Sequence, residues 1–416
     1  MGDITVRGGI PLHGKLYVQG SKNAALPILA AAILHEGISV IHNCPHILDV
    51  ENTVQILLEM GCSVEWHGNS LTIFAGTIQN TEISSEYAAQ MRSSVIFLGS
   101  LLGRMGSAAL PLPGGCTIGK RPIDLHLNSL KRMGAKIEEE KEILFAKAQN
   151  IHGADIRLRF PSVGTTENII LAAVLAEGTT RIFNAAREPE ITELCRFLKG
   201  KGAKIRGEGT DRIVIEGVKK LKDSEFVLMS DRIVAGTYLM AAMSAGGMIS
   251  LEHAPVCQMA AQFKVLKSMG AQLQIGKDKI VMSAPKRPRA LREVATQPYP
   301  GFPTDLQSQL LAVLCRARGK SRIIENIFED RYQIVPQLKK MGAQIDTAAQ
   351  EAWITGTQCL SGTEVHACEL RGGAALIIAG LGAAGETTVK ESHFIFRGYE
   401  DICGDLRKLG AVIETN

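Results

Sequence analysis

One short motif recurs six times and constrains the fold more than any other feature of the chain. In each copy a helix-like run ends in a glycine and a strand-like tail follows: Met60-Gly61-Cys-Ser-Val64, Met133-Gly134-Ala-Lys-Ile137, Lys201-Gly202-Ala-Lys-Ile205, Met269-Gly270-Ala-Gln-Leu273, Met341-Gly342-Ala-Gln-Ile345 and Leu409-Gly410-Ala-Val-Ile413. Successive glycines lie 73, 68, 68, 72 and 68 residues apart. A nearly fixed period along the whole chain indicates one structural repeat in six copies.

A second glycine precedes each motif by 23 to 28 residues, at Gly37, Gly106, Gly178, Gly247, Gly319 and Gly385. Glycine suits the left-handed position at a helix end, so we expect each repeat to contain two helices that end at these glycines. The first helices, such as 26–30 and 310–314, are apolar nearly all round and should be buried, whereas 335–341 is amphipathic. β-branched stretches at 38–41, 180–183 and 323–326 predict strands. Each repeat therefore reads helix, strand, helix, strand, strand, then a strand leading into the next repeat.

The sixth repeat lacks its last strand. Five repeats continue past the motif with a further strand pattern, at 71–74, 143–145, 212–215, 279–282 and 352–355, but the sequence stops at Asn416. The segment 3–9 has the missing pattern, and pairing it with the last sheet would satisfy an otherwise open edge. We therefore expect two domains of three repeats, 22–229 and 230–416 with 1–21, joined by two chain crossings that suit a hinge.

The composition excludes several classes of protein. The 416 residues are 45% hydrophobic, which is enough for packed cores, and 46 basic against 42 acidic side chains are too evenly balanced to predict nucleic-acid or membrane binding. The longest apolar runs are about a dozen residues, too short to span a bilayer. The first residues carry no signal pattern, so we expect a cytoplasmic protein. Nine cysteines without paired spacing argue against a disulfide framework and against a zinc site.

The predicted starts of the six buried helices are charged in five repeats. Counting 14 or 15 residues back from each second glycine reaches Lys22, Arg92, Gly164, Arg232, Asp305 and Arg371. A helix start offers free N–H groups and the positive end of the helix dipole, so a cation there makes an anion site. The alternative is that these are solvated charges on loops. Asp305 is the single carboxylate of the set and is a candidate base.

One cysteine differs from the other eight. Cys116 lies in a glycine-rich segment, 112–126, close to Lys120 and Arg121, and nearby cations favour a thiolate that is reactive or able to exchange a proton. We expect the remaining cysteines to be inert buried thiols: Cys44, Cys62, Cys195, Cys257, Cys315, Cys359, Cys368 and Cys403.

Ordered motifs along the whole chain resemble one family, the UDP-N-acetylglucosamine 1-carboxyvinyltransferases. The likeness lies in Gly20-Ser-Lys22-Asn23-Ala, Met91-Arg92-Ser, the segment from Pro113 to His126, Ser162-Val-Gly164 with Asn168, Asn184-Ala-Ala-Arg187-Glu-Pro-Glu190, Pro300-Gly-Phe-Pro-Thr-Asp305, Ile327-Phe-Glu with Arg331, Leu370-Arg371 and Arg397-Gly-Tyr-Glu400. The resemblance implies a two-domain, inside-out α/β barrel of six βαβαββ-type repeats, three in each domain, which is the enolpyruvyl transferase fold.

The resemblance also implies a reaction and its residues. The enolpyruvyl group of phosphoenolpyruvate would pass to the 3-hydroxyl of UDP-N-acetylglucosamine through a tetrahedral ketal, with release of phosphate, as the first committed step of peptidoglycan precursor synthesis. Cys116 would protonate the methylene carbon or aid product release, Asp305 would take the hydroxyl proton, and the antibiotic fosfomycin would alkylate Cys116. Lys22, Arg121 and Arg397 would hold the phosphate, with Arg331 and Arg371 close by. No metal or organic cofactor is implied. The nucleotide sugar would contact Asn23, Arg92, Arg121, Pro122, Ile123, Asp124, Leu125, Ser162, Val163, Gly164, Asp305 and Ile327.

Two alternatives remain at this stage. A transferase acting on shikimate 3-phosphate shares the six-repeat architecture but leaves the Cys116 segment without a role, and a non-enzymatic six-repeat clamp or scaffold leaves both Cys116 and Asp305 without one.

This chain also departs from the family pattern at several positions. Glu369 stands where an Asp is usual before Leu-Arg, Gly372-Gly373 replace Ala-Ser, Phe160-Pro161 replace a segment with a Lys, and Phe394 and Phe396 replace a His and an Asp.

Overall fold

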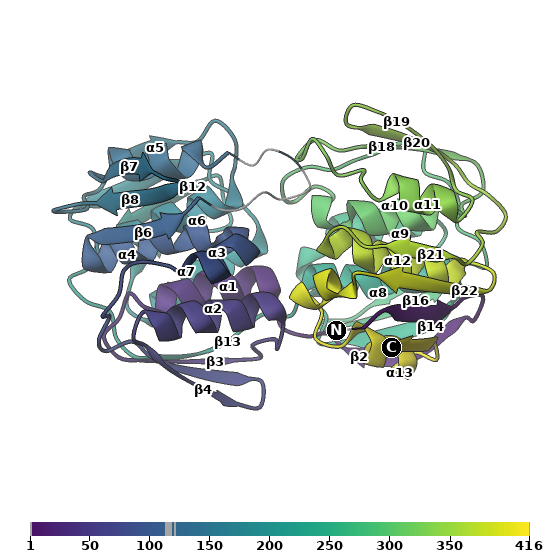
Figure 1. Cartoon of the computed structure of the whole chain (residues 1–416), viewed down its shortest axis with the longest axis horizontal. Helices are drawn as coiled ribbons and strands as arrows, with labels where there is room; N and C mark the ends of the chain where they lie inside the picture. Colours follow the sequence, from purple (N-terminus) through teal and green to yellow (C-terminus); the bar gives the residue numbers. More distant parts are fainter. Residues whose placement is uncertain (1, 113–118, 120–121, 416) are drawn as a thin grey trace. The chain divides into compact units, whose positions relative to one another are not determined.

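The computed structural model describes residues 2–112, 119 and 122–415 (Figure 1). Cys116, Lys120 and Arg121 lie outside these residues. The described chain forms two compact lobes: the first lobe comprises 20–112 and 122–229, and the second lobe comprises 2–19, 119 and 230–415. None of the described helices is long and apolar enough to cross a membrane.

The first lobe contains three repeats of the predicted helix and strand order. The first has α1 (Lys22–Ala32), β3 (Ile38–His42), α2 (Leu48–Glu59), β4 (Ser63–His67) and β5 (Ser70–Phe74). The second has α3 (Ser85–Gln90), the 3₁₀ helix η1 (Arg92–Ile96), α4 (Phe97–Met105), β6 (Ser107–Pro111), α5 (Asp124–Arg132), β7 (Lys136–Glu140), β8 (Ile143–Lys147) and β9 (Asp155–Arg157). The third has α6 (Val163–Ala173), β10 (Thr179–Phe183), α7 (Pro189–Gly200), β11 (Lys204–Arg206), β12 (Arg212–Glu216) and β13 (Ser224–Val227).

The second lobe repeats the same order and adds the start of the chain, β1 (Ile4–Arg7) and β2 (Leu12–Tyr17). Its first repeat has α8 (Arg232–Ala245), β14 (Gly247–Glu252), η2 (Val256–Gln258), α9 (Ala260–Ser268), β15 (Gln272–Ile275), β16 (Lys279–Ala284) and β17 (Val294–Ala295). The next has η3 (Thr304–Leu306), α10 (Gln307–Leu314), β18 (Lys320–Ile324), α11 (Val335–Lys340), β19 (Gln344–Ala348), β20 (Glu351–Thr355) and β21 (Glu364–His366). The last has α12 (Leu370–Gly382), β22 (Glu386–Lys390), η4 (Ser392–Arg397), α13 (Ile402–Lys408) and β23 (Val412–Thr415).

Each repeat builds one small sheet on a common plan. In the third repeat β10 pairs in parallel with β9, the strand that leads into the repeat, and antiparallel with β12, which in turn pairs with β11. Ile182 of β10 thereby lies opposite both Ile156 and Ile213, so one face of the sheet is apolar and buried. In the first lobe β13, at the end of the third repeat, pairs in parallel with β3 of the first, which links the end of the lobe to its beginning.

The start of the chain completes the last sheet, as the sequence pattern predicts. β1 lies between β22 and β23 and pairs antiparallel with both, with Val6 opposite Thr387 and Ile413 (Figure 1). Ile4 and Val6 are fully buried there. β2 then pairs in parallel with β14 of the fourth repeat. The strand missing from the sixth repeat is therefore supplied from the other end of the sequence, and this prediction is confirmed.

The first helix of every repeat lies in the interior of its lobe, and the second lies nearer the surface. In α12 every residue from Leu370 to Gly382 is buried, whereas in α7 the buried side chains follow one face. α8, α10 and α12 pack against one another at the centre of the second lobe, and α4 packs against α6 in the first. The expected contrast between buried and amphipathic helices is confirmed.

The six motif glycines end their helices in one geometry. At Gly61 the backbone is left-handed, the Gly61 N–H donates to the Leu58 carbonyl at 2.9 Å, and the Cys62 N–H donates to the Leu57 carbonyl at 3.0 Å. The same pair of bonds recurs in all six copies and satisfies carbonyls that a helix end otherwise leaves unpaired. The preceding set of glycines differs. Gly106 caps α4 directly, but the others follow their helices by a few residues, and Gly37 is not left-handed, so the cap prediction is wrong for that set apart from Gly106.

Candidate active site

Asp305 lies between two buried arginines in the second lobe. It occupies η3, at the start of α10, and both of its carboxylate oxygens are paired. Arg331 Nη2 donates to Oδ1 at 2.8 Å, and Arg371 Nη2 donates to Oδ2 at 2.8 Å. The two arginine side chains are only 2% and 4% exposed, whereas the Asp305 side chain is 27% exposed. The carboxylate is therefore held in a fixed orientation and still accessible from outside.

Two permanent cations hold the Asp305 carboxylate in this cluster. Burial by itself lowers the pKa of Arg371, but the Asp305 carboxylate, with Tyr399 and Asp231 nearby, raises that pKa above its ordinary value, so Arg371 is always a cation. The two cations are balanced by two carboxylates, because Glu369 lies 3.9 Å from Arg331 Nη1 in addition to the pairing of both arginines with Asp305. Arg331 Nε is also buried and has no acceptor among the described residues. The cluster thus has one free donor, among the described residues, beside a carboxylate that can accept a proton.

Glu369 fixes the start of α12, where Arg371 lies. It is the N-cap residue and accepts from the backbone N–H groups of Arg371, at 2.7 Å, and Gly372. It also lies 3.9 Å from Arg331 Nη1. A Cβ on Gly372 would stand 2.9 Å from Glu369 Oε1, so the glycine leaves room for the longer carboxylate to fold back onto the helix. Two departures from the family pattern therefore fit together at this helix start.

The three central helices of the second lobe begin close to one another, as the repeat predicts. Arg232 is the first residue of α8, whose N-cap Asp231 accepts from the N–H groups of Ile233 and Val234. Asp231 contributes to the raised pKa of Arg371, so the start of α8 lies near the starts of α10 and α12. Arg397 ends η4, directly before the turn into the buried Tyr399. The charged residues at these three starts belong to one region of the lobe.

In the first lobe the predicted phosphate ligand Lys22 is paired with a buried carboxylate. Lys22 is the first residue of α1, where Ser21 caps the helix, and its Nζ donates to Asp49 Oδ2 at 2.9 Å. The Asp49 side chain is 2% exposed and the Lys22 side chain 12% exposed. Asp49 begins the second helix of the same repeat, α2, and keeps the ammonium group in place beside the partly buried Asn23.

The segments predicted to bind the nucleotide sugar meet at the starts of α5 and α6. Arg159 Nη2 donates to Asp124 Oδ2 at 2.7 Å, and Ser162 caps α6 by accepting from the Thr165 N–H. A Cβ on Gly164 would lie 3.1 Å from His126 Cε1, so 122–126 and 162–164 are neighbours. Asn168 joins this region to the helix that follows Arg92: it accepts from the Gly99 N–H, donates to the Val95 carbonyl and lies 2.7 Å from His126 Nδ1.

A buried carboxyl group lies one turn into α6. Burial, together with the neighbouring Glu190 and Glu188, raises the pKa of Glu167 to about 8. In the unfolded chain its pKa is near 4.5. Between these two values the folded state holds a proton that the unfolded state releases, so the contribution of Glu167 to stability is present at low pH and is lost as the pH rises toward 8.

We expect Glu167→Gln to stabilise the protein at neutral pH, because glutamine is neutral at every pH and has the same shape. The gain in the free energy of unfolding is on the order of 3 kcal/mol at pH 7 and close to zero at pH 4.5. Denaturant unfolding between pH 5 and 8 measures it. Glu138→Gln, on the exposed strand β7, is the control. Equal slopes of stability against pH in wild type and Glu167→Gln would contradict the prediction.

The structure places the predicted site residues in two groups, one in each lobe. Asp305, Ile327, Arg331, Arg371 and Arg397 belong to the second lobe. Lys22, Asn23, Arg92, the segment 122–125 and the segment 162–164 belong to the first. Three residues that contact them were not predicted from the sequence: Asp49, which binds Lys22, Thr304, whose carbonyl accepts from Arg331, and Glu325, which accepts from the Ile327 N–H. Nothing in the repeat pattern distinguishes them from surface carboxylates and hydroxyls.

The expectation for the other cysteines holds for most of them. Burial raises the pKa of Cys62 to about 11 and those of Cys195 and Cys315 to about 12, which makes these thiols inert. Cys257 and Cys359, however, are exposed, so the prediction of burial is wrong for both. Cys257 lies in η2 and Cys359 in the connection between β20 and β21, and Cys368 is only partly buried.

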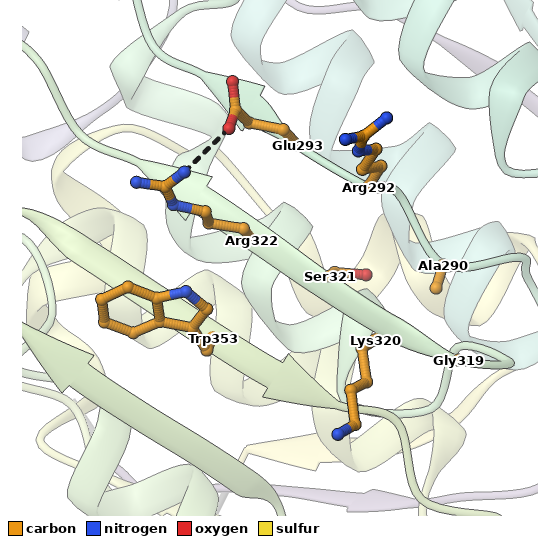
Figure 2. Close-up of a pocket in the computed structure, with 8 residues that line it drawn as sticks. All are labelled: Ala290, Arg292, Glu293, Gly319, Lys320, Ser321, Arg322 and Trp353. Atoms are coloured by element: carbon orange, nitrogen blue, oxygen red, sulfur yellow. Dashed lines mark hydrogen bonds and ion pairs between the residues drawn. The ribbon is translucent and has the colours of Figure 1, made fainter.

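A depression of about 610 Å³ lies over β18, away from the described site residues (Figure 2). Arg322 crosses it, binds Glu293 at 3.0 Å and Glu351 at 2.6 Å, and stands 5.8 Å from the centre of the Trp353 ring. Arg292 and Lys320 point away from one another (Figure 2). The central cation is already matched by two carboxylates and the other two do not converge, so this surface does not form a second anion site.

Comparison with known proteins identifies the fold and the class of the protein. The family model described as EPSP synthase (3-phosphoshikimate 1-carboxyvinyltransferase) matches residues 6–406. The solved enolpyruvyl transferase NikO from Streptomyces tendae superposes with a TM-score of 0.89 at 24% identity, over 100% of this chain and 99% of that one. EPSP synthase from Acinetobacter baumannii superposes with a TM-score of 0.75 at 20% identity, over the whole of both chains. The fold is therefore that of the enolpyruvyl transferases, and the protein is an enzyme of this class.

Two curated relatives are much closer in sequence. UDP-N-acetylglucosamine 1-carboxyvinyltransferase 2 of Caldanaerobacter subterraneus subsp. tengcongensis is 46% identical over 413 residues, 99% of each chain. UDP-N-acetylglucosamine 1-carboxyvinyltransferase of Halothermothrix orenii is also 46% identical over 413 residues, again 99% of each chain. The chain belongs to the UDP-N-acetylglucosamine 1-carboxyvinyltransferase family.

Proposed function

We propose that the protein transfers the enolpyruvyl group of phosphoenolpyruvate to the 3-hydroxyl of UDP-N-acetylglucosamine and releases phosphate. The observation that carries the proposal is Asp305, a partly exposed carboxylate whose two oxygens are bound by the buried Arg331 and Arg371. Such a group can take a proton from a hydroxyl, and the two guanidinium groups hold it in one orientation while it does so. Membership of the family supplies the identity of both substrates.

The reaction balances in two steps. In the addition, Asp305 takes the proton of the 3-hydroxyl, the sugar oxygen bonds to the central carbon of phosphoenolpyruvate, and the methylene carbon gains a proton from Cys116. In the elimination, the methyl carbon returns a proton to the Cys116 thiolate, the carbon–carbon double bond forms again, the bond from the central carbon to the phosphate oxygen breaks, and the phosphate leaves with the proton held by Asp305. Lys22, Arg121 and Arg397 hold the phosphate group, and Arg331 and Arg371 orient Asp305. The nucleotide sugar lies on residues 122–125 and 162–164, with Asn23, Arg92 and Ile327.

The biological setting follows from the family. We infer that the enzyme acts in the cytoplasm, in peptidoglycan precursor synthesis, where UDP-N-acetylglucosamine is consumed. We also propose that residues 22–229 and residues 230–416 with 1–21 act as its two domains. The two lobes of the described chain support this division, since their boundaries at 20 and 230 lie within two residues of those of the proposed domains.

Release of phosphate with different acceptors tests the proposed reaction. The protein is incubated with phosphoenolpyruvate and either UDP-N-acetylglucosamine or shikimate 3-phosphate, and phosphate is measured over time. We expect release with the nucleotide sugar only. Release with shikimate 3-phosphate alone would assign the protein to the sister activity, and release with neither acceptor would favour the non-catalytic scaffold.

We expect fosfomycin to inactivate the enzyme by alkylating Cys116. The epoxide of this phosphonate reacts with a thiolate, and the cations Lys120 and Arg121 nearby in the sequence favour that form. Peptide mass spectrometry after complete inactivation should find the adduct on Cys116, and the exposed Cys257 and Cys359 serve as internal controls for non-specific alkylation. An unmodified Cys116 peptide in the inactive protein would refute this assignment.

A further inference from the structure

Another carboxylate, that of the buried Glu325, lies next to the Asp305 cluster. The sequence pattern places Glu325 in a strand over 323–326, but β18 ends at Ile324 and Glu325 turns into the following loop. The residue is fully buried, and none of the described arginines or lysines forms an ion pair with it. Its Oε1 accepts from the N–H groups of Ile327, at 2.9 Å, and Phe328, at 3.2 Å. The prediction of a strand through residue 326 is wrong because this side chain caps a turn there.

The other oxygen of Glu325 holds the residue that precedes the candidate base. The Thr304 hydroxyl donates to Glu325 Oε2 at 3.0 Å. The Thr304 carbonyl accepts from Arg331 Nη2 at 3.2 Å, the same nitrogen that donates to Asp305. Thr304 is therefore held at its side chain and at its backbone, directly before Asp305.

These contacts close into a ring. From Glu325 one path runs through Thr304 to Asp305 and Arg331, and the other runs through the N–H of Phe328, whose ring lies 5.4 Å from the Arg331 guanidinium. The loop itself is fixed to β17, since Asn326 bonds Thr296 through its N–H at 2.9 Å and its side-chain amide at 3.1 Å. One carboxylate thus sets the positions of Asp305 and of Ile327 together.

We propose that Glu325 is a positioning residue for this reaction, acting through Thr304 on Asp305 and through the backbone N–H of Ile327 on the loop assigned to the nucleotide sugar. The inference rests on the proposed roles of Asp305 and Ile327. A base must stand within hydrogen-bond distance of the proton that it removes, and small displacements of catalytic groups are costly. The ring of contacts links Asp305 to the loop that contains Ile327, so that the distance between the base and this loop stays fixed.

Thr304 offers a test that leaves the buried carboxylate in place. Thr304→Val has nearly the same shape but cannot donate to Glu325, whereas Thr304→Ser keeps the donor. We expect Thr304→Val to lower kcat about tenfold, with little change in KM for UDP-N-acetylglucosamine, because the bonds from Glu325 to Ile327 and Phe328 remain. Thr304→Ser should restore most of the turnover. Ser321→Ala, which removes a buried hydroxyl that accepts from the Leu291 N–H in the same sheet, is the control for a purely structural loss.

The Asp305→Asn background separates this inference from the proposed function. If Thr304 acts through Asp305, Thr304→Val should lower wild-type turnover but should not lower the residual turnover of Asp305→Asn any further. Normal turnover of Thr304→Val beside an impaired Asp305→Asn would overturn the positioning role alone. Normal turnover of Asp305→Asn itself would overturn the proposed role of the base. If Ser321→Ala lost as much turnover as Thr304→Val, the role of Glu325 would be only structural, as the cap of a turn.

Discussion

Asp305→Asn lowers turnover by roughly a hundredfold or more if Asp305 is the general base. Asparagine keeps the shape and can still accept a bond from one arginine, but it cannot take a proton at neutral pH. Its amide nitrogen would also face the second guanidinium, a donor against a donor. Phosphate release under saturating phosphoenolpyruvate and UDP-N-acetylglucosamine measures the effect. Asp305→Ala should show a loss at least as large.

A binding measurement separates loss of chemistry from loss of fold. Asp305→Asn should still bind UDP-N-acetylglucosamine, as measured by calorimetry, and should keep a cooperative thermal transition. Turnover within a few fold of wild type in a folded variant would leave the base unassigned. It would also remove the observation on which the proposed function most depends.

The second large effect is expected at Arg371. Arg371→Ala removes one of the two cations on Asp305 and leaves Asp305 Oδ2 without that donor in a poorly hydrated site, so we expect kcat/KM for phosphoenolpyruvate to fall about a hundredfold. Arg371→Lys keeps the charge but has no planar fork to hold the carboxylate, and a smaller loss of about tenfold is expected. Steady-state kinetics with varied phosphoenolpyruvate measures both.

A partly buried arginine provides the control. Arg316 lies in the same lobe, and its side chain donates to the backbone carbonyl of Ser244 at the end of α8. Arg316→Lys should lower thermal stability and leave kcat/KM near that of wild type. If Arg371→Lys and Arg316→Lys had the same kinetic effect, the loss at Arg371 would reflect general destabilisation, and its placement beside the reacting groups would be wrong.

The sequence predicts the repeat plan because the backbone geometry at each helix end requires one residue type, glycine, at a fixed position in the repeat. The paired hydrogen bonds that end the six second helices require a residue with left-handed backbone, and glycine adopts this conformation with the least strain. The repeat period is therefore visible in the spacing of Gly61 and its five equivalents. The pairing of β1 follows from the same logic, since five repeats show what the sixth lacks. The charged helix starts are also predictable, because position in the repeat identifies Lys22, Asp305 and Arg371 without knowledge of their contacts.

The supporting residues could not be predicted in the same way. Glu325, Thr304 and Asp49 are ordinary in sequence and acquire their roles from contacts between residues 21 to 27 positions apart. Glu167 is similar, since its raised pKa arises from burial and from glutamates of another helix. Position in the repeat does not encode such contacts, because each occurs in one repeat only. The assignment of Cys116 depends on family resemblance and remains a prediction.

The place of β1 between β22 and β23 also affects the order of synthesis and folding. Thr5 meets Thr388 across a separation of 383 residues. At roughly 5 to 20 residues per second, a ribosome needs about 20 to 80 s to make the partner strands after it has made β1. β1 is thus made long before the strands with which it pairs, and until then its apolar Ile4 and Val6 are without their native cover. The first lobe, which needs no strand from outside 20–229, can fold during this interval.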